Sequence, residues 1–243
     1  MDIPLAIAVV AAATAASAIQ SLSGFGFSLF IVPVLAALIG PKETVLLANV
    51  LSTGLNAVQL PAIRHHVDWT ISRRLLIGSF IGMPFGVAVL LIVDAGTLKV
   101  IIAATVVLFT VLLVRGFRVH DEGRSGDFVA GLISGVLNTS TSMSGPPVVI
   151  YLQGKALSSA RFRATNCFFF LVSAAGAVGL LTLGGASSRT AWLAAVVAIP
   201  GVVAGRILGN LLYDRINEQR FRLLVYAVLL LSAAIALSST LLG

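Results

Sequence analysis

The sequence contains little charge. Of its 243 residues, 10% are Asp, Glu, Lys or Arg and 58% are apolar. A soluble domain has about 25% charged residues, and a water-facing surface cannot be built from so few. The composition therefore excludes an ordinary soluble enzyme. It predicts a single all-α polytopic membrane domain over residues 1–243, surrounded by the lipid bilayer.

Residues for catalysis and metal binding are scarce. The single cysteine, Cys167, cannot form an intramolecular disulfide, and no Cys/His cluster exists. The apolar runs contain no paired carboxylates, no HExxH, no Ser-His-Asp arrangement and no deep Asp, Glu or His, and the chain has no GxxxxGK[ST] loop. We therefore expect no catalytic residue, no metal, no cofactor, no carboxylate proton relay and no ATP-driven pumping by this chain alone.

Apolar runs fill most of the chain. They fall at about 4–22, 24–39, 43–63, 71–93, 97–114, 128–138, 145–153, 162–183, 190–213 and 221–242. A helix needs roughly 20 residues to cross the hydrocarbon, so 128–138 and 145–153 are too short for two full crossings. We expect about eight to ten membrane segments, with half-helices or re-entrant hairpins over 128–153 and, as an open alternative to full crossings, over 4–39. Broken backbone at membrane depth must be buried in protein or line a polar cavity.

The net charge of +7 is concentrated in a few connectors, so it does not indicate a nucleic-acid partner. By the positive-inside rule the cation-rich connectors are cytoplasmic. This places both termini outside, together with connectors 40–43, 94–99 and 184–189, and predicts a multi-pass protein of the cell inner membrane. The cytoplasmic cations are Arg64, Arg73, Arg74, Arg115, Arg118, Arg124, Lys155, Arg161, Arg163, Arg215, Arg220 and Arg222.

The two halves of the chain resemble each other. Pairing Trp69 with Trp192 also pairs three glycines spaced by four residues, Gly78, Gly82 and Gly86 with Gly201, Gly205 and Gly209. We expect repeats over about 1–115 and 127–243, inverted because the first begins outside and the second inside. Inverted repeats with broken helices are typical of secondary transporters, although a duplicated structural membrane protein is the alternative. The glycines predict tightly packed helix seams in each half.

Two polar breaks occupy matching places in the halves. The first break covers residues 23–28 and is followed by Pro33. The second covers residues 138–147, a polar run from Asn138 that ends at Pro146 and Pro147. Proline suits the first turn of a helix, with Ser142 or Ser144 as its cap, and a helix N-terminus at membrane depth suits an anion. The alternative is a plain hairpin turn with satisfied hydroxyls. The candidate substrate-binding residues here are Ser23, Gly24, Phe25, Gly26, Ser28, Asn138, Ser140, Thr141, Ser142, Ser144 and Gly145.

Three further side chains are candidates for the same site. Asn49 and Asn166 are each expected to open the helix after a short pair, either as donors to an anion or as interhelical contacts. Arg206 is the only cation well inside an apolar run. It either extends to the cytoplasmic interface or attracts anions in a vestibule.

At these breaks the chain resembles the TauE/SafE family of sulfite and organosulfonate permeases. The resemblance is carried by Ser23–Gly24–Phe25–Gly26 through Pro33, by Gly131–Leu132–Ile133–Ser134–Gly135 through Pro147, and by the runs that reach Asn49 and Asn166. It covers essentially the whole chain. The second break departs from the family, because many relatives have a longer glycine run where this chain has Asn, Ser and Thr.

The resemblance implies transport of small sulfur-containing oxyanions, such as sulfite or sulfoacetate, while the residues by themselves indicate only a small anionic substrate. We therefore expect a secondary anion transporter that works by alternating access, not an enzyme. The alternatives are a passive anion channel on the same scaffold and a membrane assembly factor without cargo. A homo-oligomer is compatible with the sequence.

Overall fold

The structure is a computed structural model that describes residues 2–119, 123–155 and 157–213. These residues form helices and no strand, which confirms the all-α prediction: α1 (Ile3–Ser23), α2 (Phe27–Ile39), α3 (Pro41–Ile63), the short 3-10 helix η1 (Arg64–His66), α4 (Trp69–Ile92), α5 (Ala95–Val114), α6 (Arg124–Thr141), α7 (Gly145–Gln153), α8 (Ser159–Leu183) and α9 (Arg189–Tyr213). The run 221–242, the C-terminus, and Arg215, Arg220 and Arg222 lie outside the described residues.

Six helices in the described residues are long and apolar enough to cross a membrane: α1, α3 with η1, α4, α5, α8 and α9. Apolar α2 is shorter at 13 residues, and α7 has only 9. At 1.5 Å per residue, α7 reaches about 13 Å, less than half of a bilayer core of about 30 Å. The chain is thus a polytopic membrane protein in which two helices, α2 and α7, are too short to cross the bilayer.

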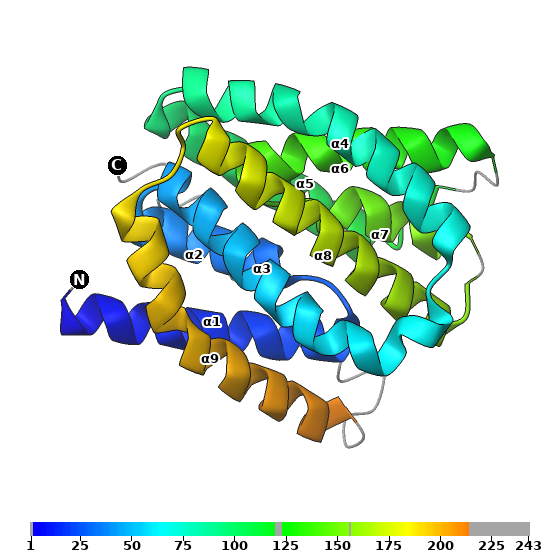
Figure 1. The fold of residues 1–243 in the computed structure, drawn as a ribbon, viewed down its shortest axis with the longest axis horizontal. Coiled ribbons are helices and arrows are strands. Elements are labelled where there is room, and N and C mark those ends of the chain that lie inside the picture. Colours follow the sequence, from blue (N-terminus) through cyan, green and yellow to red (C-terminus); the bar gives the residue numbers. More distant parts are fainter. Residues whose placement is uncertain (1, 120–122, 156, 214–243) are drawn as a thin grey trace.

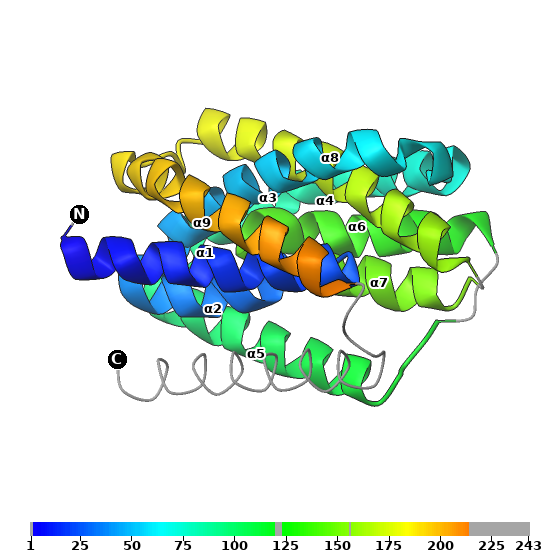
Figure 2. The ribbon, with the colours of Figure 1, turned by 90° about the horizontal axis from the view of Figure 1, so that it is seen from below.

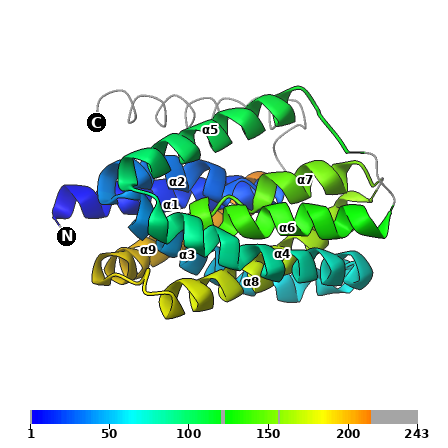
Figure 3. The same ribbon diagram turned by 90° about the horizontal axis from the view of Figure 1, so that it is seen from above.

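The helices run broadly along the long axis of the molecule (Figure 1). The pair α1 and α9 lies at one side, the pair α4 and α6 at the other, and α3 and α8 lie between them. Figures 2 and 3 show the short helices α2 and α7 following one another along that axis, with α5 alongside them. The short helices are therefore covered by long helices, with α5 on one side and α1, α3 and α6 on others.

Glycines let the two flanking helix pairs approach very closely. A Cβ atom on Gly82 of α4 would overlap the Leu132 carbonyl oxygen of α6, and one on Gly135 of α6 would overlap the Ser79 carbonyl oxygen of α4. Gly205 of α9 meets Thr14 of α1 in the same way. The close approach is as predicted, but the prediction of a seam within each half is wrong. Each seam joins one half to the other, because glycine spacing defines a helix face and does not identify the partner.

Apart from the two breaks before α2 and α7, the connectors lie at one or the other end of the long axis (Figure 1). At one end, Asp68 before α4 pairs with Arg161 of α8 at 3.1 Å, so two cation-rich segments meet there. At the other end, the Lys42 Nζ donates to the Leu91 carbonyl oxygen at 3.4 Å. The described connectors therefore separate into a cation-rich end and a cation-poor end, as expected from the sequence.

Candidate functional site

The first break is a tight turn of glycines between α1 and α2. Gly24 ends α1 with φ 79° and Gly26 precedes α2 with φ 96°, a region of φ that L-residues with side chains rarely adopt. The Ser23 hydroxyl donates to the Ile19 carbonyl oxygen at 2.7 Å and accepts from the Phe25 N–H at 3.3 Å. Ser23 thus stabilises the turn itself, with its hydrogen-bonding capacity largely used.

The second break is shorter than predicted. Asn138, Ser140 and Thr141 were expected in it, but they form the last turn of α6, which ends at Ser142 with φ 59°. The Ser140 hydroxyl donates to the Val136 carbonyl oxygen at 2.7 Å and the Thr141 hydroxyl to the Leu137 carbonyl oxygen at 2.9 Å. Such bonds to the preceding turn satisfy buried hydroxyls inside a helix, so polar composition alone does not end it here.

The N-terminal ends of α2 and α7 meet at a small pocket, although they are far apart in sequence. Four of the predicted residues line it: Gly26 and Ser28 from the first break, and Ser144 and Gly145 from the second. Ser23, Gly24, Phe25 and Ser142 are not among its lining residues. Besides those four, the lining comprises Gln20, Phe27, Leu29, Ser52, Pro146 and Phe170.

The pocket has a mixed lining of apolar and polar side chains, none of which carries a formal charge. No side chain caps α2 or α7: Ser144 sits at the N-cap position of α7 without a capping bond, and Ser142 ends α6, so neither predicted cap forms. First-turn N–H groups have no partner within their own helix, and two such ends carry the positive poles of two helix dipoles. Pro146 has no N–H, so α2 offers the fuller set of donors.

The pocket volume of about 20 Å³ is close to that of one water molecule. An oxyanion of four or five non-hydrogen atoms does not fit. The pocket is therefore too small for such an anion, and a larger ligand enters only if one of its walls moves; we refer to it at this size as the closed pocket.

Two pocket residues that the sequence analysis did not select belong to a buried polar chain. The Gln20 side chain donates to the Asn56 side-chain oxygen at 2.9 Å, and the Asn56 amide donates to the Ser52 carbonyl oxygen at 2.7 Å. The chain joins α1 to α3 beside the pocket. Gln20 could have been selected from the sequence, because it is a polar residue at the end of an apolar run, one turn before the first break.

Asn49 and Asn166 lie within α3 and α8, more than one turn from the helix starts, so the prediction that they open helices is wrong. Turn-forming propensity is overridden here by burial. The Asn49 amide donates to the Asn138 carbonyl oxygen at 3.2 Å, and the Asn138 amide donates to the Ser173 hydroxyl at 2.8 Å. These two side chains are contacts between α3, α6 and α8, which is the alternative reading of Asn49.

Asn166 is different. It is completely buried, and neither polar atom of its side chain has a partner among the described residues. A buried amide without hydrogen bonds is costly, and such a group calls for a bound ligand, water or an alternative state as its explanation. Asn166 does not line the closed pocket.

Arg206 lies away from the pocket as well. Its Nη2 donates to the Val58 carbonyl oxygen of α3 at 3.3 Å. The guanidinium thus links α9 to α3 in this state.

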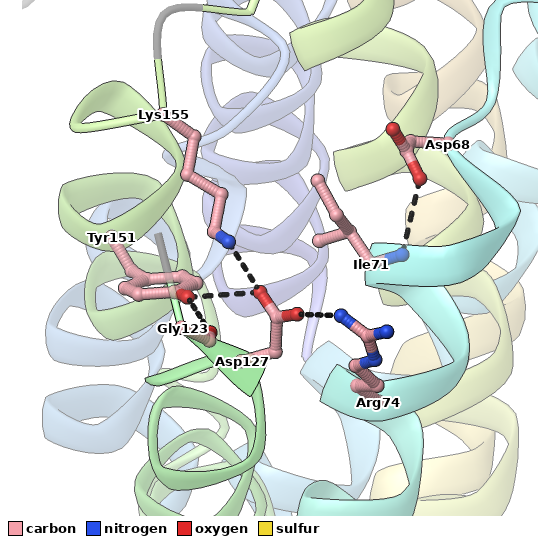
Figure 4. Close-up of polar contacts among 7 residues, drawn as sticks. All are labelled: Asp68, Ile71, Arg74, Gly123, Asp127, Tyr151 and Lys155. Carbon is pink, nitrogen blue, oxygen red and sulfur yellow. Dashed lines mark hydrogen bonds and ion pairs between the residues drawn. The ribbon is translucent and has the colours of Figure 1, made fainter. Parts of the chain in front are cut away.

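A buried carboxylate escaped the sequence analysis. The apolar runs 97–114 and 128–138 leave Asp127 in the polar connector between them, but α6 begins earlier, at Arg124, and Asp127 is 0% exposed. Figure 4 shows its carboxylate between Lys155 and Tyr151 on one side and Arg74 on the other. Its place directly before the apolar run 128–138 was the available signal.

Comparisons with known proteins identify the family of the chain. The profile of the sulfite exporter TauE/SafE family matches residues 9–236. A protein described as a probable sulfite/organosulfonate exporter TauE, from Cupriavidus necator, is 27% identical over 218 residues, which cover 87% of this chain and 85% of that protein. No solved structure matches. The chain therefore belongs to the sulfite exporter TauE/SafE family and is a membrane transport protein, not an enzyme.

Proposed function

We propose that this chain carries small sulfur-containing oxyanions, such as sulfite or an organosulfonate, across the cell inner membrane by alternating access. The observation that carries the proposal is the meeting of two uncapped helix N-termini, those of α2 and α7, at one buried pocket. The choice of sulfur-containing oxyanions as the substrate class rests on the family match and on the description of the Cupriavidus relative.

Dipoles and hydroxyls suit this cargo better than a buried cation. An anion that leaves water must be offered hydrogen bonds in exchange, and N–H groups at a helix start supply them with favourable charge. None of the pocket residues carries a formal charge, so release does not require breaking a strong ion pair. We assign Gly26, Ser28, Ser144 and Gly145 to anion contact in the opened pocket, with Asn166 as a donor that the anion reaches in another state.

The helix arrangement supports inverted repeats over about 1–115 and 127–243. The hairpin of α1 and α2 begins at the cation-poor end, whereas the hairpin of α6 and α7 begins at the cation-rich end (Figures 1 and 2). The glycine seams α4 to α6 and α1 to α9 pair each outer helix with the first helix of the other half. Rocking one half against the other would expose the pocket to each face in turn.

The positive-inside rule orients the molecule. The cation-rich end, where Asp68 meets Arg161, faces the cytoplasm in this proposal. The N-terminus, connector 40–43 and connector 94–99 then face the periplasm.

The test compares pocket variants in proteoliposomes loaded with radiolabelled sulfite. Ser28→Ala and Ser144→Ala each remove one pocket hydroxyl and should lower flux severalfold, with a larger loss in the double variant. Ser125→Ala, an exposed serine in the first turn of α6, is the matched control and should transport as the parent does. Equal flux in all four proteins would exclude the pocket as the anion site. A current with no saturation would indicate the channel alternative.

A further inference from the structure

Asp127 is held by three partners from two sides. The Lys155 Nζ lies 2.9 Å from Oδ1, the Tyr151 hydroxyl donates to Oδ1 at 2.9 Å, and the Arg74 Nη1 lies 3.2 Å from Oδ2. Arg74 belongs to α4, Asp127 to α6, and Tyr151 and Lys155 to α7 and the residues directly after it. Figure 4 shows the carboxylate bridging these elements.

The cluster fixes α7 to the rigid part of the fold. The seam between α4 and α6 is closed by glycines packed on backbone, such as Gly82 on Leu132, so Arg74 and Asp127 share one unit. The side chains of Tyr151 and Lys155 attach α7 to that unit through a carboxylate that no water reaches. A buried carboxylate that loses one partner is left with charge that the interior does not solvate, so the attachment opens only as a whole.

Helix α7 connects this cluster to the pocket. Its first residues, Gly145 and Pro146, line the pocket, and its last turns carry Tyr151 with Lys155 just beyond. With 9 residues it is the shortest α-helix in the described part of the chain. Because the closed pocket has room for about one water, entry of an anion requires a wall to move, and α7 is the wall with the least packing to give up.

We propose that Asp127 is a positioning residue for transport: its contacts with Lys155 and Tyr151 hold α7 against the pocket and must separate when the pocket opens toward the cation-rich end. Arg74 stays paired with Asp127 within the unit of α4 and α6. The inference rests on the proposed function, in which this pocket is the transport site. In this proposal the Asp127 carboxylate keeps the access route from the cation-rich end closed.

The test measures access to the pocket and needs no cargo. A reporter thiol is introduced by Ser144→Cys in a Cys167→Ala background, which removes the single native cysteine. Labelling by a membrane-impermeant methanethiosulfonate, added at the face bearing Lys155, is followed over time. Asp127→Asn should raise the labelling rate severalfold, and Asp127→Glu should restore much of the parent rate. Labelling from the opposite face should not rise.

The matched control is Asp68→Asn, which breaks the ion pair to Arg161 at the same end but leaves α7 untouched. Its labelling rate should equal that of the parent. If Asp127→Asn does not fold, Tyr151→Phe and Lys155→Gln, which each remove one partner, should both raise labelling. Parent-like labelling in these variants, or an equal rise in Asp68→Asn, would overturn the inference. Absent sulfite flux alongside faster labelling would instead overturn only the proposed cargo.

Discussion

Replacing Gly82 by alanine should loosen the packing of α4 on α6. The new Cβ would overlap the Leu132 carbonyl oxygen and lie 3.0 Å from the Val136 nitrogen, both backbone atoms of the opposing helix. A backbone atom cannot rotate out of the way as the end of a flexible side chain can, so α4 and α6 must move apart. Overpacking of this kind costs about 1–3 kcal/mol, while the better helix propensity of alanine returns about 0.5–1 kcal/mol. The net loss in unfolding free energy is about 0–2.5 kcal/mol, toward the upper end because the new Cβ meets two backbone atoms.

Gly54→Ala is the matched control with the opposite sign. Gly54 lies within α3, and a Cβ there would meet nothing within 4 Å. Only the propensity gain remains, so this variant should be more stable than the parent by up to about 1 kcal/mol.

The assay is unfolding of the purified protein in mixed micelles by increasing denaturing detergent. Helical circular dichroism reports the helices, and the fluorescence of Trp69 and Trp192 reports α4 and α9. If Gly82→Ala proved as stable as Gly54→Ala, the backbone-to-backbone seam would be refuted.

Two further changes test the site and a connector. Asn166→Ala removes no hydrogen bond among the described residues, so folding stability should change by no more than about 1 kcal/mol. Sulfite flux, in contrast, should fall severalfold. Unchanged flux across a full concentration series would contradict the role of Asn166 as an anion donor. In the connector before α5, hydrogen bonds from the backbone and side chain of Thr97 lower the pKa of Asp94 below its ordinary value. The resulting stabilisation is present above that ordinary pKa and disappears as pH falls through the lowered one. The melting temperature of Asp94→Asn should consequently fall less than that of the parent between about pH 5 and pH 3. Equal acid sensitivity of the two proteins would contradict the role of the Asp94 carboxylate as the N-cap of α5.

The sequence predicts the class of fold and the places where helices break because both follow from local chemistry. Long apolar runs become α1, α4 or α9 because every backbone group in a bilayer needs a partner. The pair Gly24 and Gly26 turns the chain where few other residues can. The alternation of cation-rich and cation-poor connectors can be predicted for a similar reason, because the positive-inside rule applies to each connector separately.

What the sequence does not predict depends on contacts between distant segments. Ser140 and Thr141 look like a break but remain helical, because their hydroxyls bond to the preceding turn. Asp127 looks like a solvated connector residue, and only the packing of α4 and α7 on α6 buries it with Arg74 and Lys155. Gln20 and Ser52 reach the pocket because α1 and α3 cross beside it.

Counterflow in proteoliposomes distinguishes an alternating-access carrier from a channel and from a protein without cargo. Vesicles loaded with unlabelled sulfite or a small organosulfonate are diluted into a trace of the radiolabelled anion, with and without a pH gradient. We expect saturable uptake that is accelerated by the unlabelled anion inside, because both anions use one pocket that opens to alternate faces. Absence of protein-dependent uptake, in vesicles shown to contain inserted protein, would contradict the proposed function.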